Sequence, residues 1–354
     1  MMIHAKARPL ISKLSIPSPI KKYFMHQDWE IDLSNNTNPY VGSLANYPDI
    51  CQNHLKDIYI STILSLKPSP KTKPKITRDN VLFTVGSMEG LDLMIRTFAE
   101  PNTDVICLTS PTFSAYEHWA LIHNLTVKHV PLLGENLNHL FIKAIVDINP
   151  KMIFLCDPNN PVGSKLDVSI IPQLCESIEG FVVVDEAYIE FSDHPSSLYY
   201  LKRYKNLIIL RTFSKAWGMA GVRCGAILAD KLVINALRYV QLPFGLSTQA
   251  QETVKESLLN PDKIFDSWAR IKMNRDTLVS ELSKLKAVKK IYKSETNFIM
   301  PIFNDFVAVL ERLKAHKINV LNCSGTIENS LRVSIGNEQQ NRKFLEAIKE
   351  ASGE

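Results

Sequence analysis

The chain has 354 residues, and 41 lysines and arginines against 36 aspartates and glutamates give it a formal charge of +5. Hydrophobic residues make up 45% and charged residues 22%, the balance of an ordinary globular protein, which excludes extensive disorder or a fibrous design. The length predicts a large and a smaller domain, and the apolar runs predict neither a membrane helix, which needs roughly 20 consecutive apolar residues, nor a secretory signal.

From about residue 80 onward, short apolar runs alternate with longer segments whose apolar residues have helical spacing. The predicted strands are Val81–Val85, Asp104–Thr109, Thr126–Pro131, Lys151–Cys156, Phe181–Val184, Leu207–Arg211 and Cys224–Ala229. Glu89–Phe98 and Val168–Ile178 are two of the intervening helical segments. Strands separated by helices are typical of βαβ units, so the sequence predicts an α/β fold with a mostly parallel seven-stranded sheet flanked by helices.

The pattern changes after Pro261. A long helical stretch, Asp262–Leu285, precedes the strand-like Ile291–Pro301 and a final segment of mixed helix and strand. We therefore expect an N-terminal arm that also forms part of the small domain (residues 1–48), a large ligand-binding domain (49–260) and a small C-terminal α+β domain (261–354).

The charge and cysteine patterns predict neither a nucleic-acid surface, a membrane surface nor a metal site. The densest basic run, Lys67–Arg78, alternates lysines with prolines and is interpreted as an extended, solvated loop. The six cysteines are far apart, with no C-x-x-C pair and no histidines clustered at metal-ligand spacing. Cysteines of this kind are typical of a reduced cytoplasm, where disulfides are rare.

An α/β sheet binds its ligand beyond the carboxyl ends of its strands, so the residues after each strand are candidates for a site. Gly86 and Ser87 open a helix after the first strand and offer backbone N–H groups to a phosphate, although the commoner role for a serine there is a simple N-cap. Asn160 lies in the tight turn that follows the fourth strand, where its amide can reach a ligand oxygen.

Charged residues follow the next strands. Asp185 ends the apolar run Phe181–Val184, where an unpaired carboxylate is costly, so we expect a cation beside it unless Asp185 only caps the next segment. Lys215 follows Leu207–Arg211 in glycine-rich, apolar surroundings, which favour a lowered pKa and Schiff-base chemistry over a surface lysine. Arg332 lies in an alternating run, as a clamp for a carboxylate or phosphate or as a strand arginine in a salt bridge.

Taken together, these residues resemble the site of fold-type I enzymes that use pyridoxal 5′-phosphate (PLP), in the class I/II aminotransferase superfamily. The closest resemblance is to the histidinol-phosphate aminotransferases, and it extends over almost the whole chain. The matching stretches are Asn36–Tyr40, Tyr47-Pro48, Ser110–Phe113, Pro158–Gly163, Val184–Phe191, Arg211–Gly225, Ser294–Phe298 and Leu331–Gly336. The segment around Lys215 is the most specific for the superfamily.

The resemblance implies a set of residues around the cofactor ring. Lys215 would bond to the cofactor and carry a proton during catalysis, and Asp185 would pair with the ring nitrogen. Tyr188 and Asn160 would hydrogen-bond the phenolic oxygen of the ring, and Phe113 would stack on its face. Lys215, Asp185 and Tyr188 are thus the predicted catalytic residues.

The resemblance also implies residues for the cofactor phosphate and the substrates. The residues that would hold the phosphate are Ser87, Met88 (through its N–H), Ser214 and Arg223. Tyr47 would reach the cofactor and substrate from the partner subunit, so a homodimer with shared active sites is expected. Arg332 would hold the anionic end of each small-molecule substrate, and Asn36 would contact the substrate as well.

The chain departs from the family pattern at three places. Thr37 stands where the family has an acidic residue, and Met88 stands where it has an aspartate. The stretch Ile318–Asn322 lacks an arginine, expected near Leu321, that helps to bind the substrate phosphate. The loss of one such charge-assisted contact costs about 1.5–3 kcal/mol in binding.

The predicted reaction is transamination of L-histidinol phosphate with 2-oxoglutarate, giving imidazole acetol phosphate and glutamate, in L-histidine biosynthesis. The missing arginine leaves open an aminotransferase of the same fold that acts on an aromatic or other amino acid. A lyase that resembles threonine-phosphate decarboxylase would share the lysine and the aspartate. A non-enzymatic effector-binding module is not expected, because Lys215 and Asp185 are both present and the motifs leave no room for a DNA-binding domain before Asn36.

Overall fold

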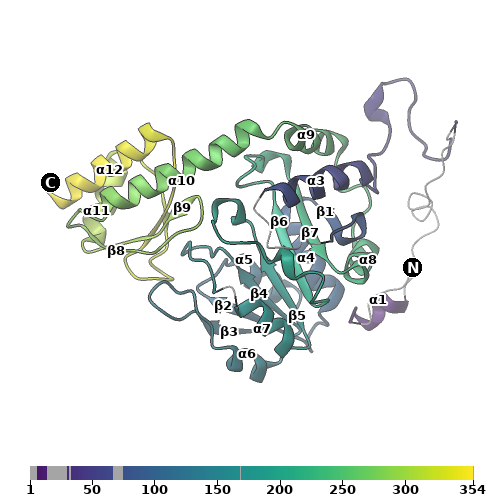
Figure 1. Ribbon diagram of the computed structural model, residues 1–354, viewed down its shortest axis with the longest axis horizontal. Helices are drawn as coiled ribbons and strands as arrows, with labels where there is room; N and C mark the ends of the chain where they lie inside the picture. The colour runs from purple at the N-terminus through teal and green to yellow at the C-terminus, as the bar shows by residue number, and fades with distance from the viewer. Residues whose placement is uncertain (1–5, 14–29, 32, 67–74, 168, 354) are drawn as a thin grey trace.

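The structure is a computed structural model that describes residues 6–13, 30–31, 33–66, 75–167 and 169–353. A large α/β part and a smaller C-terminal part lie side by side along the longest axis (Figure 1). Most of the predicted Lys67–Arg78 loop, residues 67–74, lies outside the described residues, as does Val168. Among the described helices, none has both the length and the apolar character of a membrane span.

The large part is built on the predicted seven-stranded sheet. Its strands are β1 (Val81–Thr84), β2 (Val105–Ser110), β3 (Thr126–Pro131), β4 (Met152–Cys156), β5 (Phe181–Asp185), β6 (Leu207–Thr212) and β7 (Gly225–Ala229). They lie in the order β1-β7-β6-β5-β4-β2-β3, and β7 alone runs antiparallel to its two neighbours. The prediction of a mostly parallel sheet is therefore confirmed, and each strand lies within one residue of its predicted bounds.

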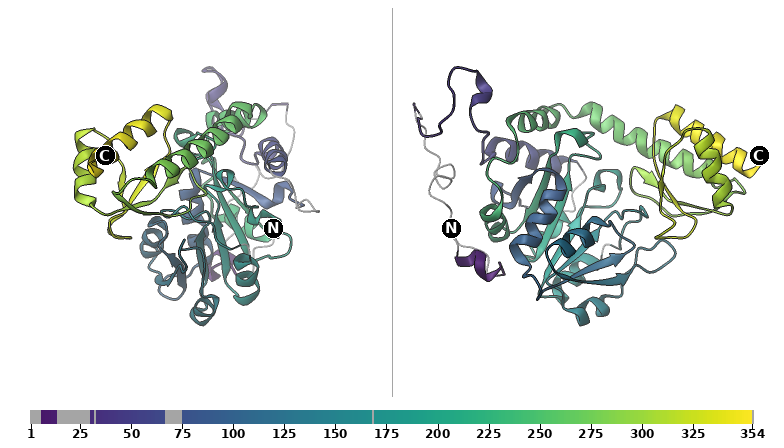
Figure 2. Two further views of the ribbon diagram at one scale, coloured as in Figure 1. Left: turned by 60° about the vertical axis from the view of Figure 1, so that its left-hand side comes forward. Right: turned by 180° about the vertical axis from the view of Figure 1, so that it is seen from behind.

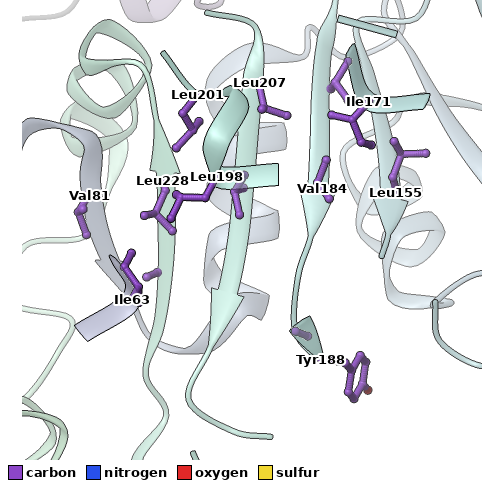
Figure 3. Close-up of a cluster of buried hydrophobic side chains, with 14 of the residues drawn as sticks. Ile63, Val81, Leu155, Ile171, Val184, Tyr188, Leu198, Leu201, Leu207 and Leu228 are labelled. Carbon is purple, nitrogen blue, oxygen red and sulfur yellow. The ribbon is translucent and has the colours of Figure 1, made fainter. Parts of the chain in front are cut away.

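The central strands are buried along their whole length and apolar except at their carboxyl ends, as expected for a sheet with helices on both faces. Every residue of β4, β5 and β6 is buried. Alternate residues point to opposite faces, so Val182 and Val184 belong to one hydrophobic cluster while Phe181 and Val183 belong to the other. Figure 3 shows part of the first cluster, in which Tyr188 lies beyond the end of the strand that carries Val184.

Helices cover the sheet on both faces. The helices of the large part are α1 (Pro9–Lys13), α3 (Asn53–Ser65), α4 (Gly86–Phe98), α5 (Ala115–Ile122), α6 (Ile142–Ile148), α7 (Ile170–Ser177), α8 (Lys231–Val240) and α9 (Thr248–Leu259). Short 3-10 turns are η2 (Ser43–Ala45), η3 (Arg78–Asn80), η4 (Ile189–Phe191), η5 (Ser197–Tyr200) and η6 (Ala220–Val222). Helices α3, α6, α7 and α9 contribute to one cluster, and α1, α4, α5 and α8 contribute to the other.

The smaller part begins with the long helix α10 (Asp262–Leu282). Its other elements are β8 (Val288–Ile291), β9 (Phe298–Ile299), β10 (Pro301–Phe303), α11 (Phe306–Ala315), β11 (Leu321–Asn322), β12 (Leu331–Ser334) and α12 (Glu338–Ser352). Strand β8 pairs with β10, and β12 lies between β11 and β9. Residues of β8, β9, β10 and β12 share one apolar core with α10, α11 and α12, whereas both residues of β11 are exposed.

The predicted strand-like stretch Ile291–Pro301 is interrupted in the structure. Residues 292–297 are not in a strand. The hydroxyl of Ser294 accepts a hydrogen bond from the Thr296 N–H (3.2 Å), and the hydroxyl of Thr296 accepts one from the Phe298 N–H (3.2 Å). These local bonds use the donors that a strand ladder needs, which explains the interruption.

The described part of the N-terminal arm extends away from the large part, on the side opposite the small part (Figure 2). Residues 33–47 include several apolar side chains that are more than half exposed: Leu33, Tyr40, Val41, Leu44 and Tyr47. Helix α1 and the residues before it, by contrast, pack against the large part through the buried Ile11 and Ala7. The arm therefore has an apolar surface that this single chain leaves open to solvent.

Candidate functional site

The candidate site lies where β4, β5 and β6 end. Asp185 is the last residue of β5, and its side chain is buried. The Tyr116 hydroxyl donates to Asp185 Oδ2 (2.7 Å), and the Ala187 N–H donates to Oδ1 (3.1 Å). Burial raises the pKa of Asp185 to about 6, although these two hydrogen bonds oppose the shift. The local bond to Ala187 accounts for one oxygen only, so capping alone does not explain this buried carboxylate.

Lys215 lies three residues after β6, close enough to Asp185 for the two charges to interact. Its Nζ is 5.8 Å from the centre of the Tyr188 ring. The pKa of Lys215 is below its ordinary value, because surrounding protein atoms reduce hydration of the amine and Arg332 adds positive charge, while Asp185 opposes the shift. The predicted lowering of this pKa thus has its expected causes, a poorly hydrated amine and nearby arginines.

Asn160 connects the large part to Arg332 of β12. The turn that carries it is held by Asn159, whose Oδ1 accepts from the Val162 N–H (3.1 Å) and whose Nδ2 donates to the Pro111 carbonyl (3.1 Å). Asn160 is buried, and its Oδ1 accepts a hydrogen bond from Arg332 Nη1 (2.6 Å). The amide NH₂ of Asn160 is therefore the end left to donate to a ligand.

Aromatic rings line the space between Lys215 and Arg332. Tyr188 is buried and packs edge-on against Phe298, with ring centres 5.2 Å apart. The Arg332 guanidinium lies 5.3 Å from the centre of the Phe298 ring, within the range of a cation–π contact. Burial raises the pKa of the Tyr188 hydroxyl, so this group stays protonated and can donate a hydrogen bond.

The first turn of α4 forms a candidate anion site. Helix α4 begins at Gly86, with φ +70°, and Val85 is its N-cap, so Ser87 lies within the first turn and does not cap the helix. The Arg223 guanidinium lies against Gly86, where an added Cβ would be 2.6 Å from Nη2, and its Nη1 donates to Ser214 Oγ (3.4 Å). Free N–H groups at a helix start beside a guanidinium and a hydroxyl suit a phosphate.

Phe113 is connected to the buried carboxylate of Asp185 through Tyr116. It is partly buried and meets Tyr116 edge-on, with ring centres 5.5 Å apart and planes at 90°. Tyr116 in turn donates to Asp185. A flat ring could therefore lie against Phe113 with one edge toward Asp185.

Asn36 and Tyr47 have a different setting in this single chain. Asn36 is exposed on the arm, and Tyr47, also more than half exposed, stacks on Phe244 with ring centres 4.5 Å apart. The contacts described above, which join Lys215, Asp185 and Arg332 to their neighbours, include neither residue. Their roles in substrate and cofactor binding remain predictions.

The strand register shows where the missing arginine would lie. Leu321 of β11 is the cross-strand partner of Arg332, so the two side chains are neighbours on one face. Leu321 is 49% exposed. The position beside Arg332 that could have carried a second cation is therefore occupied by an accessible apolar side chain.

Sequence reasoning missed several residues that support the site. Tyr116 was the most predictable of these residues. It follows Phe113 by one helical turn, and that spacing places both rings on the same face of a helix. Two buried ion pairs were also missed: Asp157 with Lys165, and Glu186 with Arg211. Glu186 and Arg211 lie in segments that match the family pattern, but nothing in the local sequence indicates that they meet.

The chain resembles known proteins over most of its length. Residues 42–348 match the family model described as aminotransferase class I and II. A histidinol-phosphate aminotransferase of Bacteroides thetaiotaomicron is 34% identical and aligns over 98% of both chains. One from Cytophaga hutchinsonii is 33% identical and aligns over 90% of both chains.

Solved structures share the fold. The histidinol-phosphate aminotransferase of Clostridium acetobutylicum superimposes with a TM-score of 0.77 at 23% identity, covering 88% of this chain and 91% of that one. The enzyme of Sinorhizobium meliloti, in complex with pyridoxal-5′-phosphate, gives a TM-score of 0.76 at 18% identity, covering 99% and 98%. L-threonine-O-3-phosphate decarboxylase of Porphyromonas gingivalis gives 0.72 at 20% identity, covering 88% and 92%. At these identities the superpositions establish the fold and no more.

Proposed function

The chain belongs to the class I and II aminotransferase family, and from this premise we propose that it transfers the amino group of L-histidinol phosphate to 2-oxoglutarate in L-histidine biosynthesis. The observation that carries the proposal is the hydrogen bond from Arg332 to Asn160. It holds the Arg332 guanidinium, which can bind an anion, close enough to the Lys215 amine to affect its pKa. The relatives of 33–34% identity that bear this enzyme's name support the choice of substrate.

Pyridoxal 5′-phosphate is the cofactor we propose, and the residues present fit it. Asp185 is a buried carboxylate without an ion-pair partner among the described residues, which suits a protonated ring nitrogen. The turn at Gly86, where Arg223 and Ser214 meet the start of α4, suits a phosphate. When bound, the cofactor supplies an aldehyde carbon that takes up the amino group and a ring that withdraws electrons from the reacting carbon.

Each residue around the ring has a definite task in this proposal. Lys215 Nζ takes the proton from the substrate Cα, and its lowered pKa makes the neutral, basic form more available. The Asp185 carboxylate holds a proton on the ring nitrogen. The Asn160 amide and the Tyr188 hydroxyl donate hydrogen bonds to the ring oxygen, and Phe113 packs on the ring face, which limits access of water.

The anionic groups have their own binding residues. Ser87, the Met88 N–H, Ser214 and Arg223 hold the cofactor phosphate. Arg332 binds the anionic end of each substrate in turn, the carboxylate of glutamate or the phosphate of histidinol phosphate. Asn36 contributes to substrate binding.

We further propose a homodimer with shared active sites, in which Tyr47 of each chain reaches the site of the other. The exposed apolar side chains of the arm support this proposal, since contiguous exposed apolar surface is typical of protein interfaces. A cytoplasmic location is supported by the six cysteines, which are all free thiols and mostly buried.

One observation favours a second candidate substrate class. Leu321 lies beside Arg332, so an apolar side chain is next to the guanidinium that we propose binds the anionic end of the substrate. An aromatic amino acid has a single carboxylate and an apolar side chain, which the side chain of Leu321 accommodates. Transamination of an aromatic amino acid is therefore the alternative to test.

A half-reaction tests the proposal directly. The protein loaded with PLP is mixed separately with L-histidinol phosphate, L-glutamate and L-phenylalanine, and the visible absorbance change that accompanies amino transfer to the cofactor is followed. We expect fast conversion with histidinol phosphate and glutamate. Conversion by phenylalanine and glutamate, with none by histidinol phosphate, would instead establish the alternative.

Lys215→Ala is the control for the site assignment. Because the variant lacks the proposed base, we expect its conversion rate to fall by about a thousandfold or more. A variant as fast as the parent would show that another residue carries the proton.

A further inference from the structure

A groove of about 680 Å³ adjoins Arg332 on the small part. It is bounded by the segment 316–321 that leads into β11, by β12 and by the first turns of α12. Arg332 lines this groove and also contacts Asn160 at the catalytic end. The groove is thus continuous with the residue that holds the anionic end of the substrate.

The charge of this groove has one sign. Its lining includes Arg332, Lys317, Lys343 and His316, and it includes no aspartate or glutamate. His316 also lines the groove, and its Nε2 lies 3.0 Å from Glu350 Oε2. Within the described part of the chain, neither Lys317 nor Lys343 forms an ion pair, and both side chains are exposed. A concave surface lined by one sign of charge attracts the opposite charge more strongly than a flat one.

Strand β11 supplies no positive charge beside Arg332, so any second cation near Arg332 has to come from elsewhere in the groove. Leu321, the cross-strand neighbour of Arg332, lines the groove as well and supplies no cation. Arg332 alone has one positive charge, whereas a phosphate monoester has a charge of about −1.5 to −2 at neutral pH. Glutamate presents only a singly charged carboxylate at that end, so the two substrates differ in how much positive charge they require.

We propose that this groove is the phosphate-recognition subsite of the enzyme, with Lys317 and Lys343 supplying the positive charge that Leu321 does not. This inference rests on the proposed function, because it assumes a phosphorylated amino substrate. Lys317 and Lys343 approach the phosphate from the solvent side while Arg332 binds it from the catalytic side. Glutamate, which is bound by Arg332, does not use the two lysines.

The test compares two lysine variants with two matched controls. Lys317→Met and Lys343→Met each remove one groove cation, whereas Lys314→Met on α11 and Lys349→Met on α12 remove the same charge from outside the groove lining. For each groove variant we expect kcat/KM for L-histidinol phosphate to fall about five- to tenfold, with the value for L-glutamate unchanged. The control variants are expected to match the parent with both substrates.

The salt dependence of kcat/KM for histidinol phosphate is a second readout. It should change if the lysines act through their charge, but not if they act only through the structure. In the parent, kcat/KM for histidinol phosphate should fall more steeply with ionic strength than in the variant that lacks both groove lysines. Introducing Leu321→Arg into that double variant places a guanidinium beside Arg332, and we expect it to restore most of the lost activity with histidinol phosphate.

Three outcomes would overturn the inference. Parent-level activity of both groove variants with histidinol phosphate would show that the lysines do not bind the phosphate. An equal loss with glutamate would show that they act through the structure. If the parent enzyme converts glutamate but not histidinol phosphate, the proposed substrate and this subsite are both refuted. That outcome is seen with the parent alone, whereas the other two outcomes refute only the subsite and require the variants.

Discussion

Two consecutive carboxylates at the end of β5 have opposite surroundings. Glu186, on one side, is fully buried and accepts hydrogen bonds from Arg211 Nη2 (2.8 Å), Ser196 Oγ (2.7 Å) and the Ser197 N–H (2.6 Å). Asp185, on the other, is also buried but accepts only from the Tyr116 hydroxyl and one N–H among the described residues. Glu186 forms an ion pair within the fold, whereas Asp185 forms none with the described residues.

The difference separates a structural charge from a functional one. A buried carboxylate is costly unless a cation and further hydrogen bonds compensate it. Glu186 is compensated within the chain, and its partner Arg211 has a raised pKa because Glu186 and other neighbours outweigh the effect of burial. Asp185 is buried without such compensation, and this destabilises its charged form. A cationic ligand would stabilise that form, which favours binding of the protonated ring of the proposed cofactor.

The largest expected effect comes from removing the cation of the compensated pair. Arg211→Met leaves Glu186 buried without its partner, so we expect the free energy of unfolding to fall by about 3–5 kcal/mol. Urea unfolding followed by circular dichroism measures the change. A loss below about 1 kcal/mol would mean that the pair contributes no more than a surface contact.

A surface pair provides the matched control for this variant. Arg203 Nη2 lies 2.7 Å from Glu176 Oε1, but both side chains are more than half exposed. Arg203→Met is therefore expected to change the free energy of unfolding by less than about 1 kcal/mol.

The next effect comes from neutralising the uncompensated carboxylate. Asp185→Asn removes the partner of the ring nitrogen, so we expect the half-reaction to slow by about 10²–10³-fold. The folding stability of the cofactor-free chain should respond in the opposite direction. It should rise, because a costly buried charge is gone.

The pH dependence of that stability has a definite sign. The pKa of Asp185 is raised from 3.8 to about 6 by burial, so the native state loses stability as the pH rises through this window and carries the full cost above it. The advantage of Asp185→Asn over the parent should therefore be larger near pH 8 than near pH 5, by about 1 kcal/mol. An advantage that does not grow with pH would show that Asp185 is not a destabilising charge.

The smallest effect concerns the hydrogen bond to Asp185. The Tyr116 hydroxyl stays protonated, because burial and the nearby Asp185 raise its pKa, and its bond stabilises the charged carboxylate. Tyr116→Phe should raise the pKa of Asp185, and we expect the acidic limb of cofactor binding against pH to move up by about 0.5–1 pH unit. Tyr204→Phe is the control, since Tyr204 donates to the distant Glu176 (2.6 Å) and should leave that limb in place.

Much of the fold and of the site was predictable because it depends on local pattern. Apolar runs predict all seven strands of the large sheet, and the positions after these strands make Asp185, Asn160 and Lys215 site candidates. The phosphate role of Ser87 stays a prediction, whereas its alternative role as the N-cap is wrong, because Val85 is the N-cap of α4. The stretch Ile291–Pro301 was only partly predictable, since Ser294 and Thr296 divide it through their own side-chain hydrogen bonds.

The sequence by itself determined which segments are buried strands, which residues end them and which family the chain resembles, since periodicity and residue order are local properties of the chain. Only the tertiary structure decided which charges meet. The pairing of Glu186 with Arg211, the contact of Arg332 with Asn160 across 172 residues, and the position of Leu321 beside Arg332 all depend on strand order and register. An ion pair or a groove is formed by residues distant in sequence, and its energy depends on burial that no local pattern specifies.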